Sequence, residues 1–124
     1  MKNRMFIIPD TNFLIYITKY KLLDKLGEYS IVLIKQIIDE LKKLSEDKKT
    51  KIEDRDAALI VLEFLKRKKF KIKKCEGKTD DAILCIAKKY NTAIATMDKE
   101  LIKRAKKSYI KVIKIRQKKY LREE

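Results

Sequence analysis

The stretch Met5-Phe6-Ile7-Ile8-Pro9-Asp10-Thr11-Asn12 joins an apolar run to a turn signal and then to polar side chains. A short apolar run that ends at such a signal predicts a buried β-strand. The following residues, 11–20, place Phe13 and Ile17 on one side of a predicted helix. A strand that leads directly into a helix is typical of an α/β fold, and Asp10 lies at the junction.

The same alternation continues along the rest of the chain. Further strands are predicted over 30–34, 70–73, 92–96 and 110–115, and further helices over 35–45, 53–68, 79–90 and 99–107. Strands that alternate with helices predict a three-layer α/β/α sandwich around a central, mainly parallel sheet of about five strands. In such sheets the ligand site lies beyond the carboxyl ends of the strands, near a switch in strand order.

Composition limits the domain organisation. The chain has 124 residues, 45% of them hydrophobic, with two glycines and one proline. These values predict a single domain over 1–124, with a basic C-terminal strand and tail at about 108–124. No apolar run approaches the ~20 residues of a membrane span, so we expect no membrane association. Cys75 and Cys85 lack a metal-binding spacing and indicate reduced thiols in a cytoplasmic protein.

Positive charge is concentrated in the second half of the chain. The formal net charge is +15, and most of the excess lies in the run 66–74 and in the tail after Lys103. Such density suits RNA phosphates, although an anionic membrane surface or a merely solvated face would also tolerate it. The predicted RNA contacts are Lys66, Arg67, Lys68, Lys69, Lys71, Lys73, Lys74, Arg116, Lys118 and Lys119.

Acidic residues lie beside the most apolar stretches of this basic chain. They are Asp10, Glu40, the pair Asp80-Asp81, and Asp98. A carboxylate near a core is costly unless it is paired or bound to a metal. Asp10 follows the first predicted strand and Asp98 follows the strand over 92–96, so both are expected at the functional edge of the sheet.

Helical phase selects among the remaining acids. In the helix over 35–45, Glu40 lies at the border of the apolar arc, whereas Asp39 points to the opposite side. In the helix over 79–90, the apolar arc includes the direction of Asp80 but not that of Asp81. Thr79 or Asp80 would serve equally well as a helix N-cap, which requires no function.

The residue types that are missing restrict the chemistry. The chain has no histidine, which excludes histidine acid-base catalysis, serine or cysteine triads, and histidine-type zinc sites. Only two glycines are present, too few for a glycine-rich nucleotide-binding loop. Carboxylate chemistry with a hard cation remains. Mg²⁺ or Mn²⁺ takes oxygen ligands, activates water and neutralises phosphate oxygens during phosphodiester cleavage.

Four segments together resemble the PIN-domain nucleases in order and context across nearly the whole chain. They are residues 7–14 around Asp10, the helix with Glu40, residues 80–87 and residues 94–101. The resemblance implies an endoribonuclease with Mg²⁺ or Mn²⁺ as cofactor. Carried over by position, the catalytic and metal-binding acids would be Asp10, Glu40, Asp80 and Asp98, with Asp81 as a substitute ligand and Asn12 and Thr96 as supporting residues.

Within that family, the tail over 112–121 and the segment over 80–84 look most like the archaeal relatives of the eukaryotic small-subunit-processome nuclease. This likeness implies a ribosomal RNA precursor as substrate and a role in ribosomal RNA processing. The alternatives are a VapC-type toxin ribonuclease held inactive by an antitoxin, and a non-cleaving ribosome-assembly factor that binds RNA. A homodimer is also compatible with the sequence.

Overall fold

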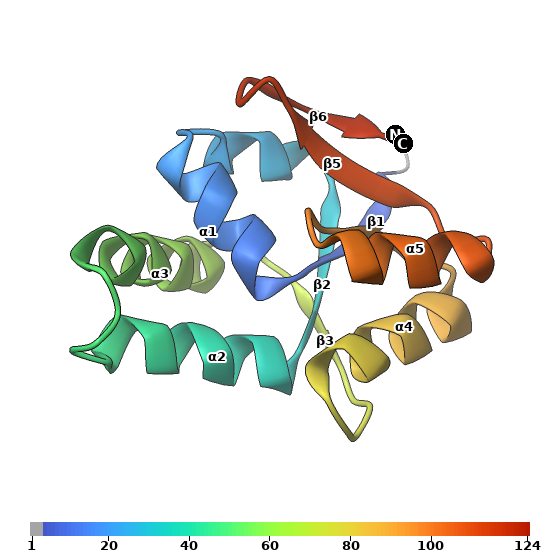
Figure 1. Cartoon of the computed structure of the whole chain (residues 1–124), viewed down its shortest axis with the longest axis horizontal. Helices are drawn as coiled ribbons and strands as arrows, with labels where there is room; N and C mark the ends of the chain where they lie inside the picture. The colour runs from blue at the N-terminus through green and yellow to red at the C-terminus, as the bar shows by residue number, and fades with distance from the viewer. Residues whose placement is uncertain (1–3) are drawn as a thin grey trace.

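The computed structural model describes residues 4–124 as one sheet between two layers of helices (Figure 1). The strands are β1 (Phe6–Pro9), β2 (Ser30–Ile34), β3 (Lys71–Lys73), β4 (Ala93–Ala95), β5 (Val112–Arg116) and β6 (Tyr120–Glu123). Their order in the sheet is β3-β2-β1-β4-β5-β6. The first five strands pair in parallel, and β6 pairs with β5 in the antiparallel direction. The predicted sandwich is confirmed, with one strand more than expected.

The helices cover opposite faces of the sheet because the chain builds the sheet in two directions. It first moves from β1 to β2 and β3, and then returns across β1 to β4 and β5. Right-handed crossovers therefore place the first group of helices on one face and the second group on the other. The first group is α1 (Thr11–Lys19), α2 (Lys35–Glu46) and α3 (Ile52–Arg67), and the second is α4 (Thr79–Tyr90) and α5 (Lys99–Lys107) (Figure 1). No helix within residues 4–124 combines the length and apolar composition needed to cross a bilayer.

The central strands are buried on both faces, which explains why they are apolar without alternation. Ile7 and Ile8 in β1 and Leu33 in β2 have no exposed surface. A strand covered by helices on both sides needs apolar side chains at successive positions. From the helical layer, Phe13 and Ile17 of α1 pack into the same core. The apolar runs in the sequence are therefore the middle of the sandwich.

The sheet changes direction between β1 and β4. These strands pair in register, with Ile7 opposite Ala93 and Pro9 opposite Ala95. The backbone N–H of Asp10 continues the ladder by donating to the Ala95 carbonyl oxygen at 3.0 Å. The loops that follow β1 and β4 consequently begin side by side at the carboxyl edge, where ligand sites form in such sheets.

Two elements were not expected from the sequence. A short 3₁₀ helix, η1 (Leu23–Glu28), connects α1 to β2, and a tight turn joins β5 to β6. In that turn Gln117 and Lys118 adopt left-handed backbone angles, with φ of 54° and 55°. Turns of this kind usually contain glycine, asparagine or aspartate, so this sequence gives no hairpin signal.

The burial difference between two leucines gives a stability prediction. Leu33 in β2 has 0% exposed surface and Leu59 on α3 has 50%. We expect Leu33→Ala to lower the free energy of unfolding by about 2–5 kcal/mol, because it leaves a cavity between β2 and the helices. Leu59→Ala, with identical chemistry, should cost under ~1 kcal/mol. Urea denaturation of both variants tests this, and equal losses would contradict the assignment of β2 to the core.

Candidate active site

Asp10 and Asp98 occupy equivalent positions after neighbouring strands. Asp10 is the N-cap of α1, and one of its carboxylate oxygens accepts a hydrogen bond from the Phe13 backbone N–H at 2.7 Å. Asp98 is the N-cap of α5 and accepts from the Leu101 backbone N–H at 2.8 Å. Each acid therefore begins a helix directly beyond a parallel strand, and the two lie at the same edge of the sheet. This is the arrangement expected from the sequence.

Thr96 connects these two acids. Its side chain has 0% exposed surface, and its hydroxyl donates to the second carboxylate oxygen of Asp10. The same hydroxyl oxygen accepts from the backbone N–H of Asp98 at 3.0 Å. A hydroxyl can do both because it carries one donor and two acceptor positions. Thr96 thus fixes the Asp10 carboxylate relative to the start of α5, as a supporting residue would.

Glu40 reaches the same edge from α2. Its carboxylate oxygens accept hydrogen bonds from the hydroxyls of Thr11 and Thr79, each at 2.5 Å. Thr11 lies in the first turn of α1 and Thr79 in the first turn of α4. Glu40 therefore joins the beginnings of two helices on opposite faces of the sheet. The two threonines are site residues that sequence reasoning missed, because their role depends on how three helices pack.

The neighbouring acids of α4 are in different environments. Asp80 lines the hollow that also contains Asp10, Glu40 and Asp98. Asp81 instead accepts a hydrogen bond from the Arg104 guanidinium of α5 at 2.6 Å and does not line that hollow. The preference for Asp80 that helical phase indicated agrees with this geometry, and the structure gives Asp81 an ion pair in place of the substitute-ligand position.

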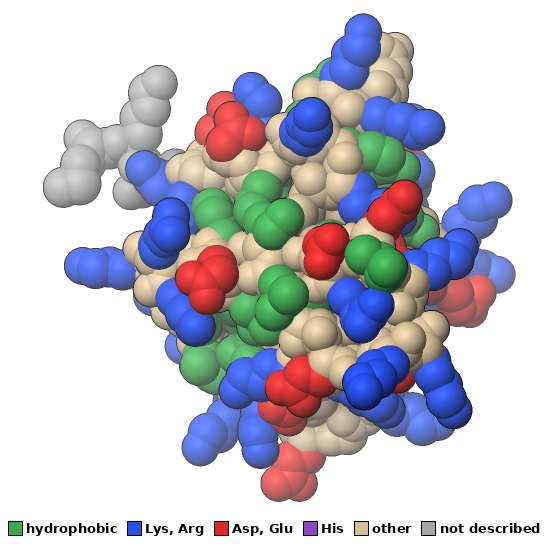
Figure 2. Space-filling view, turned by 90° about the vertical axis from the view of Figure 1, so that its left-hand side faces the viewer, with side chains coloured by type: hydrophobic (Ala, Val, Ile, Leu, Met, Phe, Trp, Pro, Cys, Tyr) green, Lys and Arg blue, Asp and Glu red, His purple; other side chains and the backbone are tan. Residues whose placement is uncertain are grey.

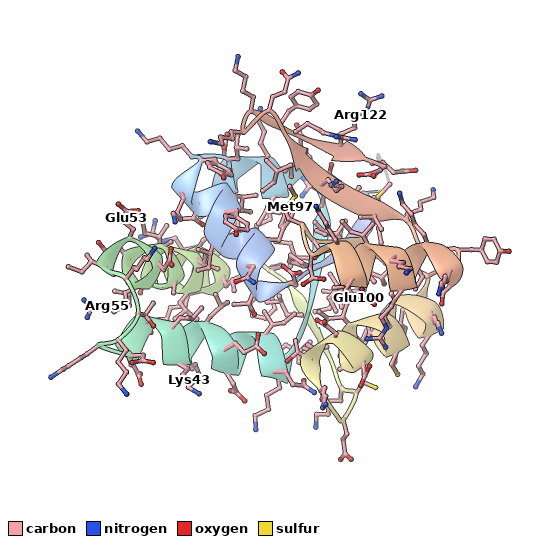
Figure 3. All side chains as sticks on the ribbon, viewed as in Figure 1. Lys43, Glu53, Arg55, Met97, Glu100 and Arg122 are labelled. Atoms are coloured by element: carbon pink, nitrogen blue, oxygen red, sulfur yellow. The ribbon has the colours of Figure 1, made fainter. Side chains whose placement is uncertain are left out.

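The acids surround a hollow of about 380 Å³. Asn12 lines it, as the sequence predicted for a supporting residue. Lys43 and Asp47, on the following turns of α2 or at its end, also line the hollow and were not predicted. Figure 3 shows Lys43 on α2. The residues 40, 43 and 47 recur at helical spacing, which is the signal that would have identified the last two.

Burial and neighbouring charge shift the protonation of this group. Burial raises the pKa of Asp10 from 3.8 to about 6, against the lowering effect of the hydrogen bonds from Thr96 and the Phe13 N–H, and the charges of Asp80 and Asp98 raise it further. Burial, followed by the Asp98 charge, also raises the pKa of Asp80, although Arg104 opposes this. The hollow therefore holds carboxylates whose negative charge is not fully compensated by protein cations.

The donor chemistry of the hollow fits a hard divalent cation. Its ligands would be carboxylate oxygens, which Mg²⁺ and Mn²⁺ prefer. Within residues 4–124, however, no three acidic side chains are gathered tightly enough to form a ready metal cage. Both oxygens of Glu40 are engaged by threonine hydroxyls. The set accordingly suits an ion that retains several waters, as Mg²⁺ usually does in proteins.

The predicted RNA contacts do not line the acidic hollow. Lys68, Lys69 and Lys71 lie with Arg4 around the amino-terminal ends of β1 and β2, the opposite edge of the sheet. In the hairpin, Lys118 lies over the Tyr20 ring at 5.6 Å, beyond the far end of α1. Figure 2 shows Lys and Arg side chains spread over one whole face, with apolar side chains between them. The basic runs in the sequence therefore do not form one track into the hollow.

The remaining predicted contacts lie apart from one another as well. Lys66 forms an ion pair with Glu63 on α3. Lys73, near the carboxyl edge, lies over the Tyr90 ring at 4.3 Å, and Lys74 lines a shallow apolar groove beside Ile72. Arg67 ends α3, Arg116 ends β5 and Lys119 belongs to the hairpin turn. Charge density along the chain thus does not correspond to density on the surface.

Comparison with known proteins identifies the family and the fold. A family model described as "PIN like domain" matches residues 4–118. The chain is 34% identical over 122 residues to Ribonuclease VapC4 of Methanocaldococcus jannaschii, an alignment that covers 92% of each protein. It is also similar to a solved domain of a functionally unknown protein from M. jannaschii, with a TM-score of 0.64 and 17% identity over 90% of this chain and 91% of that one. The last likeness concerns the fold alone.

The raised pKa of Asp10 predicts how stability depends on pH without metal. Protonated Asp10 is favoured in the folded state, so its contribution is complete below about pH 4 and is lost as the pH rises through about 6. Relative to Asp10→Asn, which keeps the cap and the volume, the wild type should lose about 2–3 kcal/mol between pH 4 and 7. Urea denaturation of both proteins in EDTA measures this. A difference that stays constant with pH would contradict the burial of the charge.

Proposed function

This chain belongs to the PIN-like domain family, and from that premise we propose that it is a divalent-metal-dependent endoribonuclease of the VapC toxin type. The observation that carries the proposal is the hollow at the β1–β4 switch point, which contains Asp10, Glu40, Asp80 and Asp98. Phosphodiester hydrolysis needs such oxygen ligands around a hard cation. An intact acid set argues against a protein that only binds RNA.

The VapC4 likeness favours the toxin alternative over the ribosomal RNA-processing function that the sequence first indicated. That likeness covers 92% of both proteins, whereas the likeness to processing nucleases rests on a short, lysine-rich tail and on the five residues 80–84. We therefore propose that the chain acts in the cytoplasm as a single domain, that its substrate is a structured cellular RNA, and that an antitoxin is its protein partner.

Each acid has a proposed role. Asp10, Asp80 and Asp98 would hold a Mg²⁺ or Mn²⁺ ion, which when bound neutralises phosphate oxygens and makes a bound water more acidic. Thr96 keeps the Asp10 carboxylate in place through its hydrogen bond. Glu40, oriented by Thr11 and Thr79, orients the attacking water and accepts its proton at a carboxylate oxygen.

Lys43 is the basic counterpart of these acids. It lies one helical turn beyond Glu40 and lines the same hollow. An ammonium group there would bind a non-bridging oxygen of the scissile phosphate and offset the charge that develops during attack by water. Asn12 would complete the binding of the phosphate or of a water through its side-chain amide.

The neighbouring aspartates of α4 provide a matched test of the proposed activity. We expect Asp80→Asn to reduce metal-dependent RNA cleavage by at least about a hundredfold, because it removes a ligand. Asp81→Asn removes the same charge one residue later but affects only an exposed ion pair, and should change the rate by less than about threefold. Cleavage of a transfer-RNA pool and of ribosomal-RNA precursor fragments would be measured with Mn²⁺, Mg²⁺ or EDTA.

The substrate and the two variants decide different parts of the proposal. Metal-dependent cuts in transfer RNA or mature ribosomal RNA would support the toxin assignment. Cuts confined to the spacers of the precursor would instead favour ribosomal RNA processing. Equal activity of Asp80→Asn and wild type would contradict the metal site. No cleavage of any RNA by wild-type protein with either ion would contradict the enzyme assignment.

The position of Lys43 makes a second kinetic prediction. Lys43→Gln should lower kcat/KM by about 10–100-fold, since it removes a cation that faces the scissile phosphate. The same change should lower the Mn²⁺ concentration that gives half-maximal activity, because one fewer positive charge competes with the ion among the carboxylates. A Mn²⁺ titration of the cleavage rate separates these effects. A rise in the required Mn²⁺ would indicate that Lys43 instead positions the ligands.

A further inference from the structure

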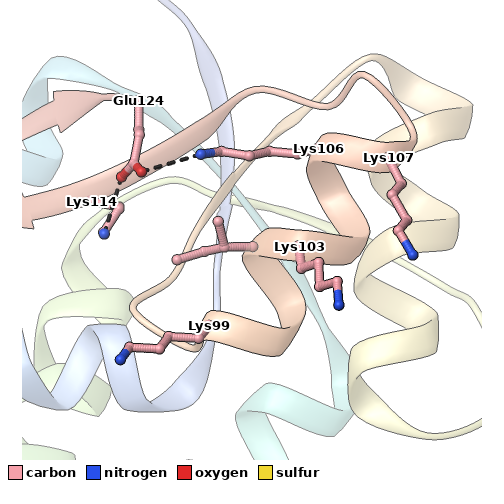
Figure 4. A pocket seen from close by; sticks show the side chains of 7 residues that line it. Lys99, Lys103, Lys106, Lys107, Lys114 and Glu124 are labelled. Carbon is pink, nitrogen blue, oxygen red and sulfur yellow. Dashed lines mark hydrogen bonds and ion pairs between the residues drawn. The ribbon is translucent and has the colours of Figure 1, made fainter.

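A second hollow, of about 560 Å³, lies between the outer side of α5 and the edge formed by β5 and the C-terminal residue (Figure 4). It is lined by Lys99, Ile102, Lys103, Lys106, Lys107, Lys114 and Glu124. We call it the α5–β5 groove. Five of its seven lining residues are lysines, so its potential is strongly positive, and it lies outside the acidic site.

The groove already holds one anionic group. The Glu124 carboxylate approaches the Nζ atoms of Lys106 and Lys114 at 3.2 and 3.1 Å, and a guanidinium nitrogen of Arg116 at 3.7 Å. Figure 4 shows the carboxylate between the two lysine side chains. These lysines hold the pKa of Glu124 below its ordinary value. Three cations that converge on two anionic oxygens could donate hydrogen bonds to the non-bridging oxygens of a phosphate in the same way.

The backbone explains why Glu124 occupies this position. β6 pairs with β5, with Glu123 opposite Ile113, and the Glu124 N–H donates to the Val112 carbonyl oxygen at 2.8 Å. The side chain is carried over β5 by this pairing, but its own contacts are ion pairs at a partly exposed surface. Such pairs contribute little to stability, so the carboxylate can be displaced by a competing anion without loss of the fold.

Two consecutive residues at the start of α5 line the two hollows. Asp98 lines the acidic hollow, and the next residue, Lys99, lines the groove. From there Lys103 and then Lys106 and Lys107 follow on successive turns of α5, each about 5.4 Å further along the helix. The inward side of the helix carries Leu101, Ile102 and Ala105. A row of lysines thus extends away from the proposed cleavage site.

We propose that the α5–β5 groove binds the RNA backbone beside the scissile bond, with one phosphate taking the place of the Glu124 carboxylate between Lys106 and Lys114. The inference rests on the proposed ribonuclease function and identifies the surface that holds the substrate strand. An acidic protein segment is less well matched, because protein interfaces need apolar or aromatic anchors at their centre. The groove offers Ile102 alone, and that residue is 8% exposed.

Binding can be measured separately from cleavage. The probe is a fluorescein-labelled twelve-nucleotide oligouridylate, titrated in EDTA and followed by anisotropy at several salt concentrations, with circular dichroism to verify folding. We expect Lys103→Gln/Lys106→Gln to weaken binding and to reduce the slope of log affinity against log salt by about 1.4, about 0.7 for each lost phosphate contact. The matched variant Lys68→Gln/Lys69→Gln loses the same charge at the opposite edge and should keep the wild-type slope.

A second pair of matched variants tests whether a phosphate displaces the Glu124 carboxylate. Glu124→Gln should raise the affinity for the probe several-fold at each salt concentration, because the phosphate no longer has to displace a carboxylate. The salt slope should stay near the wild-type value, because the number of phosphate contacts is unchanged. Glu123→Gln makes an equal change of net charge at the adjacent residue, which does not line the groove, and should change the affinity by less than about twofold. Equal effects of the two variants would overturn the displacement.

The outcomes separate the groove from the proposed function. If the two double variants weaken RNA binding equally, or if Lys68→Gln/Lys69→Gln weakens it more, the groove is not the binding surface. Metal-dependent cleavage by the wild type would in that case still support the ribonuclease assignment. Groove-dependent binding with no cleavage under any metal condition upholds the binding surface and overturns the enzyme. Binding of a polyglutamate peptide in preference to the oligouridylate would overturn RNA as the ligand.

Discussion

Carboxylates that are drawn together away from water repel one another, and this repulsion is the constraint on which the site depends. Asp10 has only 8% of its surface exposed, and the charges of Asp80 and Asp98 raise its pKa further. The fold tolerates this because backbone N–H groups at two helix N-termini and the Thr96 hydroxyl hold the acids. These contacts fix the carboxylates but do not neutralise them, so a divalent cation would add the missing charge.

The helix dipole explains how a basic chain can carry an acidic hollow and a lysine groove so close together. α5 begins with Asp98 and ends with basic residues, including Lys106 and Lys107. Negative charge at the N-terminus and positive charge at the C-terminus of a helix are both favourable. The same polarity that stabilises α5 therefore suits both proposals, an acid that would bind a cation at one end and lysines that would bind phosphates along the rest. The charges of α5 are therefore favourable for the stability of the helix as well as for the proposed function. The ion pairs of Glu124 with Lys106 and Lys114 are not explained by the helix dipole, and they are the observation that favours anion binding.

The parts of the molecule that could be predicted from sequence are those determined locally. Apolar runs followed by helical periodicity predicted the layers of strands and helices. The position of an acid after a strand predicted that Asp10 and Asp98 lie at one edge of the sheet. Helical phase distinguished Asp80 from Asp81 by the apolar arc of the helix, and in the structure Asp81 points away from the hollow toward Arg104. The contacts of Glu40 with Thr11 and Thr79 could not be predicted, since they depend on how three helices meet. The β5–β6 hairpin was missed because Gln117 and Lys118 lack the usual turn chemistry.

The basic tail illustrates how composition alone can favour one relative over another. Together with residues 80–84, this tail indicated a likeness to ribosomal RNA-processing nucleases, but a short segment rich in one residue type matches many proteins by charge alone. In the structure the same residues have a structural role. They form the β5–β6 hairpin, which carries Glu124 to Lys106 and Lys114 and closes one side of the α5–β5 groove. Among the basic residues of 112–121 only Lys114 lines the groove, so the composition of the tail does not by itself indicate which RNA is cut.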